Sequence, residues 1–384
     1  MKAISAGRQI GQPRFSFDDF LNILKIGALN FLYLSLKPSD NFPNKPKTMH
    51  AGKKYTFFEF IVWTRRDIYR LTILAIIPTV LYHFCKFTFL SISWVPVALL
   101  GTAVSFIISF KNNASYSRLW EARQIYGGII NASRAFGVMV RDYLAAQDKT
   151  TDVQIIFYRH FAWLTALRFQ LREPRAWENA NDPRNIEYAR LYHVSEKTDK
   201  LEDTLSQYLS ADELKYILNK KNKATQLMAL QSSHINKLAT AGNLSDLQLQ
   251  SLQNSITSFY DNQGKAERIK NFPYPRHFSS IATIMLNLFV FLVPYGLLNE
   301  FNKLGNGTLI EGYSIWLNVP FAILLTWVFN SLDIVGESST NPFEGSANDV
   351  PITNISRTIE IDMRDMLDET DLPPVLIPEN SILM

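Results

Sequence analysis

The chain has 384 residues, 19% of them charged, and a formal net charge of +4, so it can hold one large or two modest domains. The small net charge, without basic clusters interleaved with aromatics, argues against a nucleic-acid partner. The single cysteine, Cys85, excludes an internal disulfide. The mean hydropathy of −0.04 is that of a soluble protein, so membrane segments must be sought in local windows.

The first stretch, residues 1–54, contains one amphipathic pattern. Within 16–36 the apolar residues fall largely on one face, behind a start signal at Ser16. Lys25 argues against a spanning helix there. We therefore expect a helix lying on a membrane surface or packed on a partner, followed by a proline- and lysine-rich linker over 37–54.

Three apolar runs lie at 71–90, 281–298 and 313–332. The first is apolar apart from His83 and Lys86, and its length is enough to cross a hydrocarbon layer of ~30 Å. The other two carry no charge. A soluble protein of this size could bury one such run, but several runs favour a bundle of membrane helices.

A further span is predicted at 94–111, where an apolar stretch continues into polar and charged residues up to Arg123. Only Gly101 weakens the helical pattern, so we expect one long helix that leaves the apolar medium near Lys111. Two stripes follow helical spacing. One is Thr102, Phe106 and Phe110; the other, of small residues that allow close helix packing, is Gly101, Ser105 and Ser109. Spacing alone favours the alternative, two ordinary stripes of a buried bundle.

Basic residues set the predicted orientation. Arg65, Arg66 and Arg70 precede the first span, and further basic residues follow Lys111. The positive-inside rule then places both termini and the region 111–280 in the cytoplasm. Residues 124–180 are expected to continue as helix. Polar helices are expected in 183–262, one of them opened by a capping box at Ser210 and Glu213.

The sequence offers no constellation for catalysis. The six histidines show no metal-ligand spacing, and there is no glycine-rich phosphate loop. We therefore expect no enzyme activity, no catalytic residues, no metal site and no cofactor.

Two motifs carry a family resemblance. The run FKNNASYSRLWEAR, residues 110–123, resembles the second transmembrane helix of bestrophins, ion channels of bacteria, plastids and animal cells. The run NPFEGSANDVPITNISRTIEIDM, residues 341–363, resembles the segment that follows their last span. The resemblance covers roughly 55–182 and 265–365, but neither the first 50 residues nor 183–262.

The resemblance implies an all-α protomer with four transmembrane helices and a helical cytoplasmic region, five copies of which surround one pore. Thr102, Phe106 and Phe110 match the pore neck, although the family usually has a bulky apolar residue where Thr102 stands. Tyr274, between two prolines, matches an inner constriction; the alternative is a loop tyrosine at a helix start.

Lys111, Asn112 and Asn113 would then form the pore mouth. Lys111 lies about 100° from Phe110 around the helix, so it could instead point into a neighbouring helix. In animal bestrophins an acidic loop binds calcium. The matching positions here offer only two carboxylates and one amide, so we expect no calcium gate. These positions are Glu344, Ser346, Ala347, Asn348 and Asp349.

The implied function is passive conduction of small monovalent ions, chloride foremost, by a homo-pentamer in the bacterial inner membrane. Alternatives are a cation channel of the same family, and a membrane-anchored signalling or scaffold protein that acts through 183–262. The predicted organisation is an N-terminal segment (1–54), a first membrane half (55–182), a cytoplasmic helical insert (183–262), a second membrane half (263–365) and a tail (366–384).

Overall fold

The computed structural model describes residues 57–145, 150–304, 306–307, 311–379 and 382–384. The helix expected within 16–36 and the linker at 37–54 lie outside these residues. The described part is helical, with one isolated β-bridge between Glu379 and Ile382. Its α-helices are α2 (Phe57–His83), α3 (Trp94–Ala145), α4 (Thr150–Arg172), α5 (Pro183–Tyr188), α6 (Ser195–Thr198), α7 (Leu201–Leu205), α8 (Ala211–Leu218), α9 (Lys223–Thr240), α10 (Asp246–Asn271), α11 (Arg276–Leu304), α12 (Asn318–Glu337) and α13 (Ile352–Asp365).

Helix α3 is one continuous helix of 52 residues, as the sequence predicted. At 1.5 Å per residue it is about 78 Å long, more than twice the ~30 Å hydrocarbon thickness of a bilayer. Only part of it can lie in a membrane, and the apolar part is the first. The predicted continuation beyond residue 124 is confirmed as far as Ala145, after which α4 covers 150–172.

Three segments of the described residues are long and apolar enough to cross a membrane: Thr88–Leu144, Arg276–Leu304 and Ser314–Glu337. Helix α2 is not among them, because every stretch of 18 residues within it contains Arg66, Asp67 and Arg70. The prediction of one helix over 71–90 was wrong at its end. Helix α2 stops at His83, and Lys86 adopts a left-handed conformation with φ of 56° that a helix cannot continue through.

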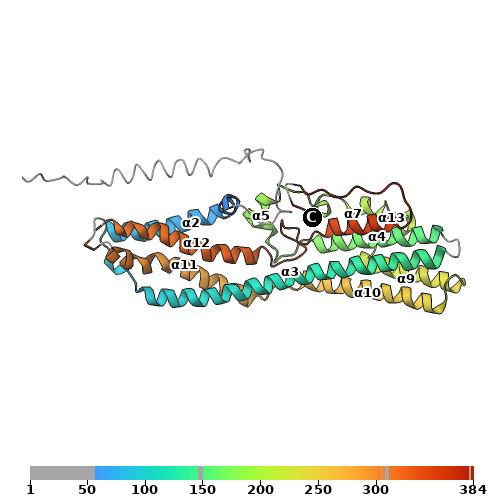
Figure 1. Cartoon of the computed structure of the whole chain (residues 1–384), viewed down its shortest axis with the longest axis horizontal. Coiled ribbons are helices and arrows are strands. Elements are labelled where there is room, and N and C mark those ends of the chain that lie inside the picture. Colours follow the sequence, from blue (N-terminus) through green and yellow to red (C-terminus); the bar gives the residue numbers. More distant parts are fainter. Residues whose placement is uncertain (1–56, 146–149, 305, 308–310, 380–381) are drawn as a thin grey trace, which may run out of the picture. The chain divides into compact units, whose positions relative to one another are not determined.

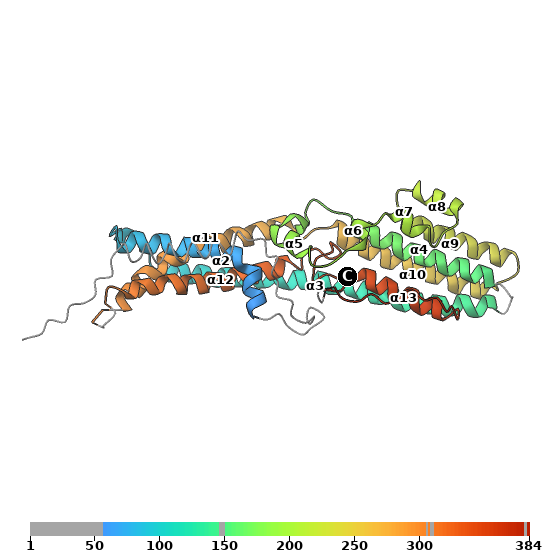
Figure 2. The same cartoon turned by 90° about the horizontal axis from the view of Figure 1, so that it is seen from above.

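The first half of α3 packs with α11 and α12, and α2 packs on α12 and α11; Figures 1 and 2 show these helices side by side. Within this bundle the polar side chain of Asn318 is buried and donates to Thr79 at 2.9 Å. The buried apolar side chains form one shared cluster. Its buried residues are Leu71, Ala75, Val97, Val104, Ile108, Leu286, Phe289, Val290, Val293 and Ala322.

The second half of α3 packs with α4, α10 and α13, and α9 joins them through α4 and α10 (Figure 2). Apolar residues of 205–269 enter the same core as those of α3 and α4, among them Leu227 and Phe259. The stretch 183–262, expected as an insert, therefore shares its core with the rest of the helical region rather than forming one of its own.

The predicted cap at Ser210 is half confirmed. The Ser210 side chain accepts a hydrogen bond from the backbone N–H of Glu213 at 3.4 Å, which caps α8. The Glu213 carboxylate pairs instead with Arg159 at 2.5 Å. A full capping box occurs at the start of α10, where Ser245 and Gln248 exchange hydrogen bonds.

Candidate functional site

The site begins with the buried face of α3, which repeats every three or four residues. Val97, Gly101, Val104, Ile108 and Lys111 are buried. At about 100° per residue these positions lie within one narrow sector of the helix. This sector faces α11 and α12, so the opposite side of α3 is left uncovered by the described residues.

The predicted stripe lies on that uncovered side. Thr102 is exposed, and Phe106 and Phe110 are 63% and 71% exposed. Phe106 lies about 180° around the helix from the centre of the buried face. Two large aromatic side chains are thus presented outward on an apolar helix, where lipid, another copy of the chain or the water of a pore meets them.

The stripe of small residues divides between two environments. Gly101 is buried against α11, where a Cβ atom at its position would lie only 2.7 Å from the Phe289 ring. Gly101 therefore allows the close approach of α3 and α11. Ser105 and Ser109 are exposed, and the Ser105 hydroxyl donates to the Gly101 carbonyl at 2.9 Å.

Of the three residues expected at the pore mouth, only Asn113 is exposed on the stripe side. Lys111 is 3% exposed, and its Nζ lies 2.8 Å from Asp333 Oδ1 on α12. Asn112 donates to the Leu332 carbonyl at 2.9 Å. Lys111 therefore takes the alternative position, against a neighbouring helix, and Asn112 also contacts that helix, which the sequence did not predict. The reason is helical phase, since position 111 continues the buried face of Val104 and Ile108.

The exposed stripe continues into the polar half of α3 with residues that the sequence reasoning did not single out. Asn113, Ser117 and Gln124 are exposed at the same three- and four-residue spacing that relates them to Phe110. Beside them Tyr116 and Trp120 stack with ring centroids 6.3 Å apart. The signal that could have revealed them is this spacing, along which the side chains change from aromatic to amide and hydroxyl near Lys111.

Tyr274 lies in the link between α10 and α11. Residues 272–275 are not helical, and α11 begins at Arg276, directly after Pro275. The two prolines that flank Tyr274 account for this break, because neither can continue a regular helix. Tyr274 itself is half-buried.

The loop between α12 and α13 is built around the carboxylate of Asp349. Its oxygens accept hydrogen bonds from the backbone N–H groups of Phe343, Gly345 and Val350 at 2.7 to 2.8 Å. Arg172 donates to the same carboxylate at 2.6 Å. These four donors occupy the oxygen atoms that a calcium ion would need, so the loop is organised by a side chain rather than by a metal.

Glu344 is the second carboxylate of that loop, and it is buried. It accepts a hydrogen bond from the backbone N–H of Asn179 at 3.2 Å. Burial, with the nearby negative charges of Asp349 and Glu178, raises the pKa of Glu344 to about 7. The loop thus holds one carboxylate that is fully paired and one that takes up a proton near pH 7.

The described residues contain no group of three or more histidine, cysteine or acidic side chains placed to hold a metal ion. They do contain buried ion pairs that join distant segments, such as Lys270 with Glu178. Such pairs fix the relative positions of helices, because breaking one leaves an uncompensated buried charge. Among the described residues the main candidate site is therefore the exposed surface along α3 rather than a cluster of reactive side chains.

Comparison with known proteins agrees with this organisation. The chain is 24% identical over 313 residues to the voltage-dependent anion channel-forming protein YneE of Escherichia coli K12, covering 81% of this chain and 88% of that protein. It is 26% identical over 286 residues to the voltage-dependent anion channel-forming protein RSc3414 of Ralstonia nicotianae, covering 73% of this chain and 80% of that protein.

The fold is similar to that of a bacterial bestrophin homologue from Klebsiella pneumoniae, with a TM-score of 0.67 and 23% identity over 80% of this chain and 99% of that one. The sequence model described as "Bacterial/Fungal Bestrophin protein" matches residues 63–365, which include the stretch 183–262. That match spans well over half of the sequence, and the chain therefore belongs to the bacterial and fungal bestrophin family.

Proposed function

We propose that the chain is one subunit of a channel that conducts small anions passively, and that the first half of α3 forms the pore wall. The observation that carries the proposal is the exposed stripe of Thr102, Phe106 and Phe110, opposite the face that packs on α11 and α12. The similar proteins of Escherichia coli and Ralstonia are named as voltage-dependent anion channel-forming proteins, and this supports the assignment.

The exposed side of α3 also supports assembly around an axis. Thr102, Ser105 and Ser109 are polar and exposed in the single chain, and hydrocarbon is a poor environment for such a helix face. If copies of α3 surround a pore, these hydroxyls meet neighbouring copies or water. We take five copies from the family resemblance. The Phe106 rings then form a narrow apolar neck, which gates by losing water.

The membrane placement includes α2 as a fourth span. Leu71 and Ala75 of α2 belong to the same apolar core as the three candidate spans. The charged start of α2 faces the segment after α4, since Arg65 and Arg66 pair with Glu187. These arginines therefore lie on the same side as the helical region that follows α3. With the positive-inside rule, this supports cytoplasmic termini and an inner-membrane location.

The choice between anions and cations is the point on which a second candidate function has support. No charged side chain belongs to the exposed stripe formed by Thr102, Phe106, Phe110 and Asn113, and Asp333 compensates the charge of Lys111. A cation channel of the same architecture is therefore the alternative. Tyr274 at the break between α10 and α11 is the proposed inner constriction in either case.

The deciding experiment is the reversal potential of the purified protein in planar bilayers under a potassium chloride gradient. A reversal potential near the chloride equilibrium value supports the anion channel. A value near that of potassium supports the cation channel. Absence of current from a protein whose measured mass shows five copies would contradict both and favour a scaffold role.

A further inference from the structure

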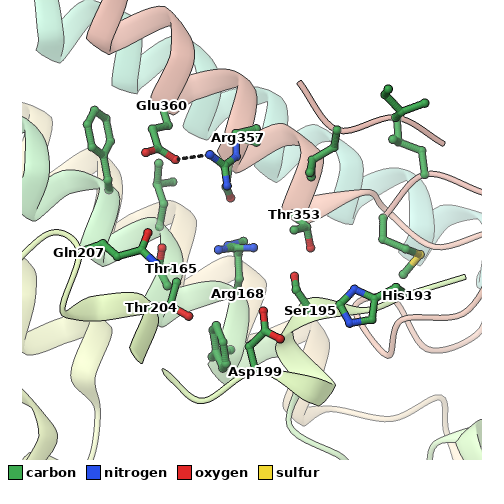
Figure 3. Close-up of a pocket in the computed structure, with 18 of the residues that line it drawn as sticks. Thr165, Arg168, His193, Ser195, Asp199, Thr204, Gln207, Thr353, Arg357 and Glu360 are labelled. Carbon is green, nitrogen blue, oxygen red and sulfur yellow. Dashed lines mark ion pairs between the residues drawn. The ribbon is translucent and has the colours of Figure 1, made fainter. Parts of the chain in front are cut away.

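A cavity of about 280 Å³ lies away from α3's exposed stripe, between α4, the segment 193–208, α13 and the last part of the chain (Figure 3). One part of its wall is apolar, with Phe161, Leu164 and Ile377 among the lining residues. The rest is polar. Since one water takes about 30 Å³ of the liquid, the cavity has room for a molecule the size of roughly nine waters.

Two arginines from different helices reach this cavity. Arg168 comes from α4 and Arg357 from α13, and Figure 3 shows their guanidinium groups directed toward each other across it. The hydroxyl of Thr165 lies on the same wall as Arg168. Two like charges that face one cavity repel each other unless an anion lies between them.

The nearby carboxylates compensate these arginines only in part, although Glu196 Oε2 has no hydrogen-bond partner among the described residues. Glu196 accepts from Arg168 at 2.5 Å, but the same oxygen also accepts from Thr353 at 2.6 Å. Glu360 lies 3.6 Å from Arg357, beyond hydrogen-bond distance. Its two oxygens accept from Arg364 and from the Tyr208 hydroxyl, at 2.9 and 3.0 Å.

Some hydrogen-bond donors at the cavity therefore have no close acceptor among the described residues. Arg168 is 11% exposed, and its Nε atom has no hydrogen-bond partner among the described residues. Arg357 makes only the long ion pair with Glu360 in the described part of the chain. Thr165 is buried and also lines the cavity. Arg357 is 30% exposed, but Arg168 Nε is a buried donor without an acceptor among the described residues. Such donors are rare in folded proteins, and they mark places where a ligand or water completes the set.

We infer that this cavity binds a small organic acid, whose carboxylate lies between Arg168 and Arg357 and accepts from Thr165, and whose carbon chain lies against Phe161 and Leu164. A planar guanidinium pair presents the donors that a carboxylate accepts. The apolar wall favours a short hydrocarbon chain over an inorganic ion. The inference does not depend on ion conduction, since it concerns a different part of the chain.

Asp199 and Glu379 also line the cavity, so the acid could be a plain carboxylate or an amino acid whose ammonium group meets one of them. The carboxylate is common to both. Hexanoate represents the plain acid and leucine the amino acid. Each has about eight or nine heavy atoms, a size that the cavity admits, so comparing their binding shows which kind of acid it takes. Hexylamine, which reverses the charge, is the matched probe.

The test is thermal unfolding of the full-length protein in detergent with increasing hexanoate, leucine or hexylamine. Hexanoate or leucine should raise the melting temperature in a saturable way, because a ligand that binds only the folded state stabilises it. Hexylamine should not. Tighter binding of leucine than of hexanoate identifies the amino acid as the ligand class, and the reverse identifies the plain acid.

Arg357→Gln should weaken binding of the acid about tenfold or more, because it removes charge-assisted donors. Thr165→Val keeps the shape of the side chain and should weaken binding of the acid by a smaller factor. It provides a second test in case Arg357→Gln does not fold. Arg134→Gln is the control, since Arg134 also pairs with α13, through Asp362 at 2.6 Å, but does not line the cavity. No saturable stabilisation by either acid, equal binding by Arg357→Gln and the natural chain, or binding of hexylamine would each overturn the inference.

Discussion

Lys111 on α3 and Asp333 on α12 form an ion pair of 2.8 Å across 222 residues of sequence, with side chains 4% and 9% exposed. A pair this deeply buried is stable only when both charges are present, because either one alone lacks water and a partner. The position of α3's stripe therefore depends on this pair as well as on apolar packing.

We predict that Lys111→Met destabilises the protein by about 3–5 kcal/mol, since it leaves the Asp333 carboxylate buried and unpaired. The double variant Lys111→Met with Asp333→Leu should recover most of the loss. Melting temperatures of the three variants in one detergent measure this. Normal stability of Lys111→Met together with a shifted reversal potential would instead place Lys111 at the pore mouth.

Phe106→Ala should raise ion flux into liposomes, because a wider and less apolar neck holds water. Its stability should change little, since the side chain is 63% exposed in the subunit. The matched control is Phe289→Ala, which empties a buried position against Gly101 and should cost about 3–5 kcal/mol. If Phe106→Ala instead loses stability as Phe289→Ala does and gains no flux, Phe106 is a packing residue.

Tyr274→Ala should change the relative permeation of large and small ions while assembly remains intact. The reason is that the two prolines hold Tyr274 in a non-helical link, which can aim its ring away from the helices it joins. Bi-ionic reversal potentials with ions of increasing size are the measurement. A folding defect with unchanged permeation ratios would make it a loop tyrosine.

Glu344→Gln should change how stability depends on pH. The Glu344 pKa is raised from 4.5 to about 7 in the folded protein, mainly by burial. Between these values the unfolded chain has lost its proton while the folded one keeps it, so stability falls as pH rises from 4.5 to 7 and stays low above. Glu344→Gln has no charge to bury and should be more stable than the natural protein at pH 8, by about 1–3 kcal/mol.

The measurement is melting temperature from pH 4.5 to 8.5 for both proteins. The two curves should converge at the acid end and separate as pH rises. Parallel curves would show that Glu344 is ionised in the folded state. The groups that face it, Asp349, Glu178 and Lys197, are unchanged in the variant, so their own contributions appear in both curves.

Calcium should have no effect on melting temperature or flux, at concentrations up to about 1 mM. The physical reason is that Asp349 already accepts from three backbone N–H groups and Arg172. A calcium-dependent rise in melting temperature that Asp349→Asn abolishes would contradict this.

Much of the helical framework could be predicted from sequence because its signals are local. The uninterrupted pattern from Trp94 onward predicted one helix, and helical phase predicted that Thr102, Phe106 and Phe110 share a face. The end of α2 could not be predicted, since no glycine or proline marks it. Lys86 ends the helix with a left-handed backbone that lysine only rarely adopts.

The candidate sites were harder to predict, because they depend on contacts between segments far apart in the sequence. Whether Lys111 faces a pore or a neighbouring helix depends on a partner in α12, which spacing along α3 does not reveal. The cavity between Arg168 and Arg357 depends on side chains from four separate segments. Phe343 and Gly345 owe their left-handed conformations to the hydrogen bonds that Asp349 accepts across the loop, again beyond local pattern.

The unbroken length of α3 makes it a lever. With the Lys111–Asp333 pair as fulcrum, its short arm reaches Trp94 and its long arm reaches Ala145. At 1.5 Å per residue the arms measure about 26 and 51 Å, so a tilt of about 3° moves the two ends by roughly 1.3 and 2.7 Å in opposite directions. A displacement of the helices packed on the long arm is thereby transmitted to the Trp94 end at about half its size, and to Phe106, about 7.5 Å from the fulcrum, at about one seventh.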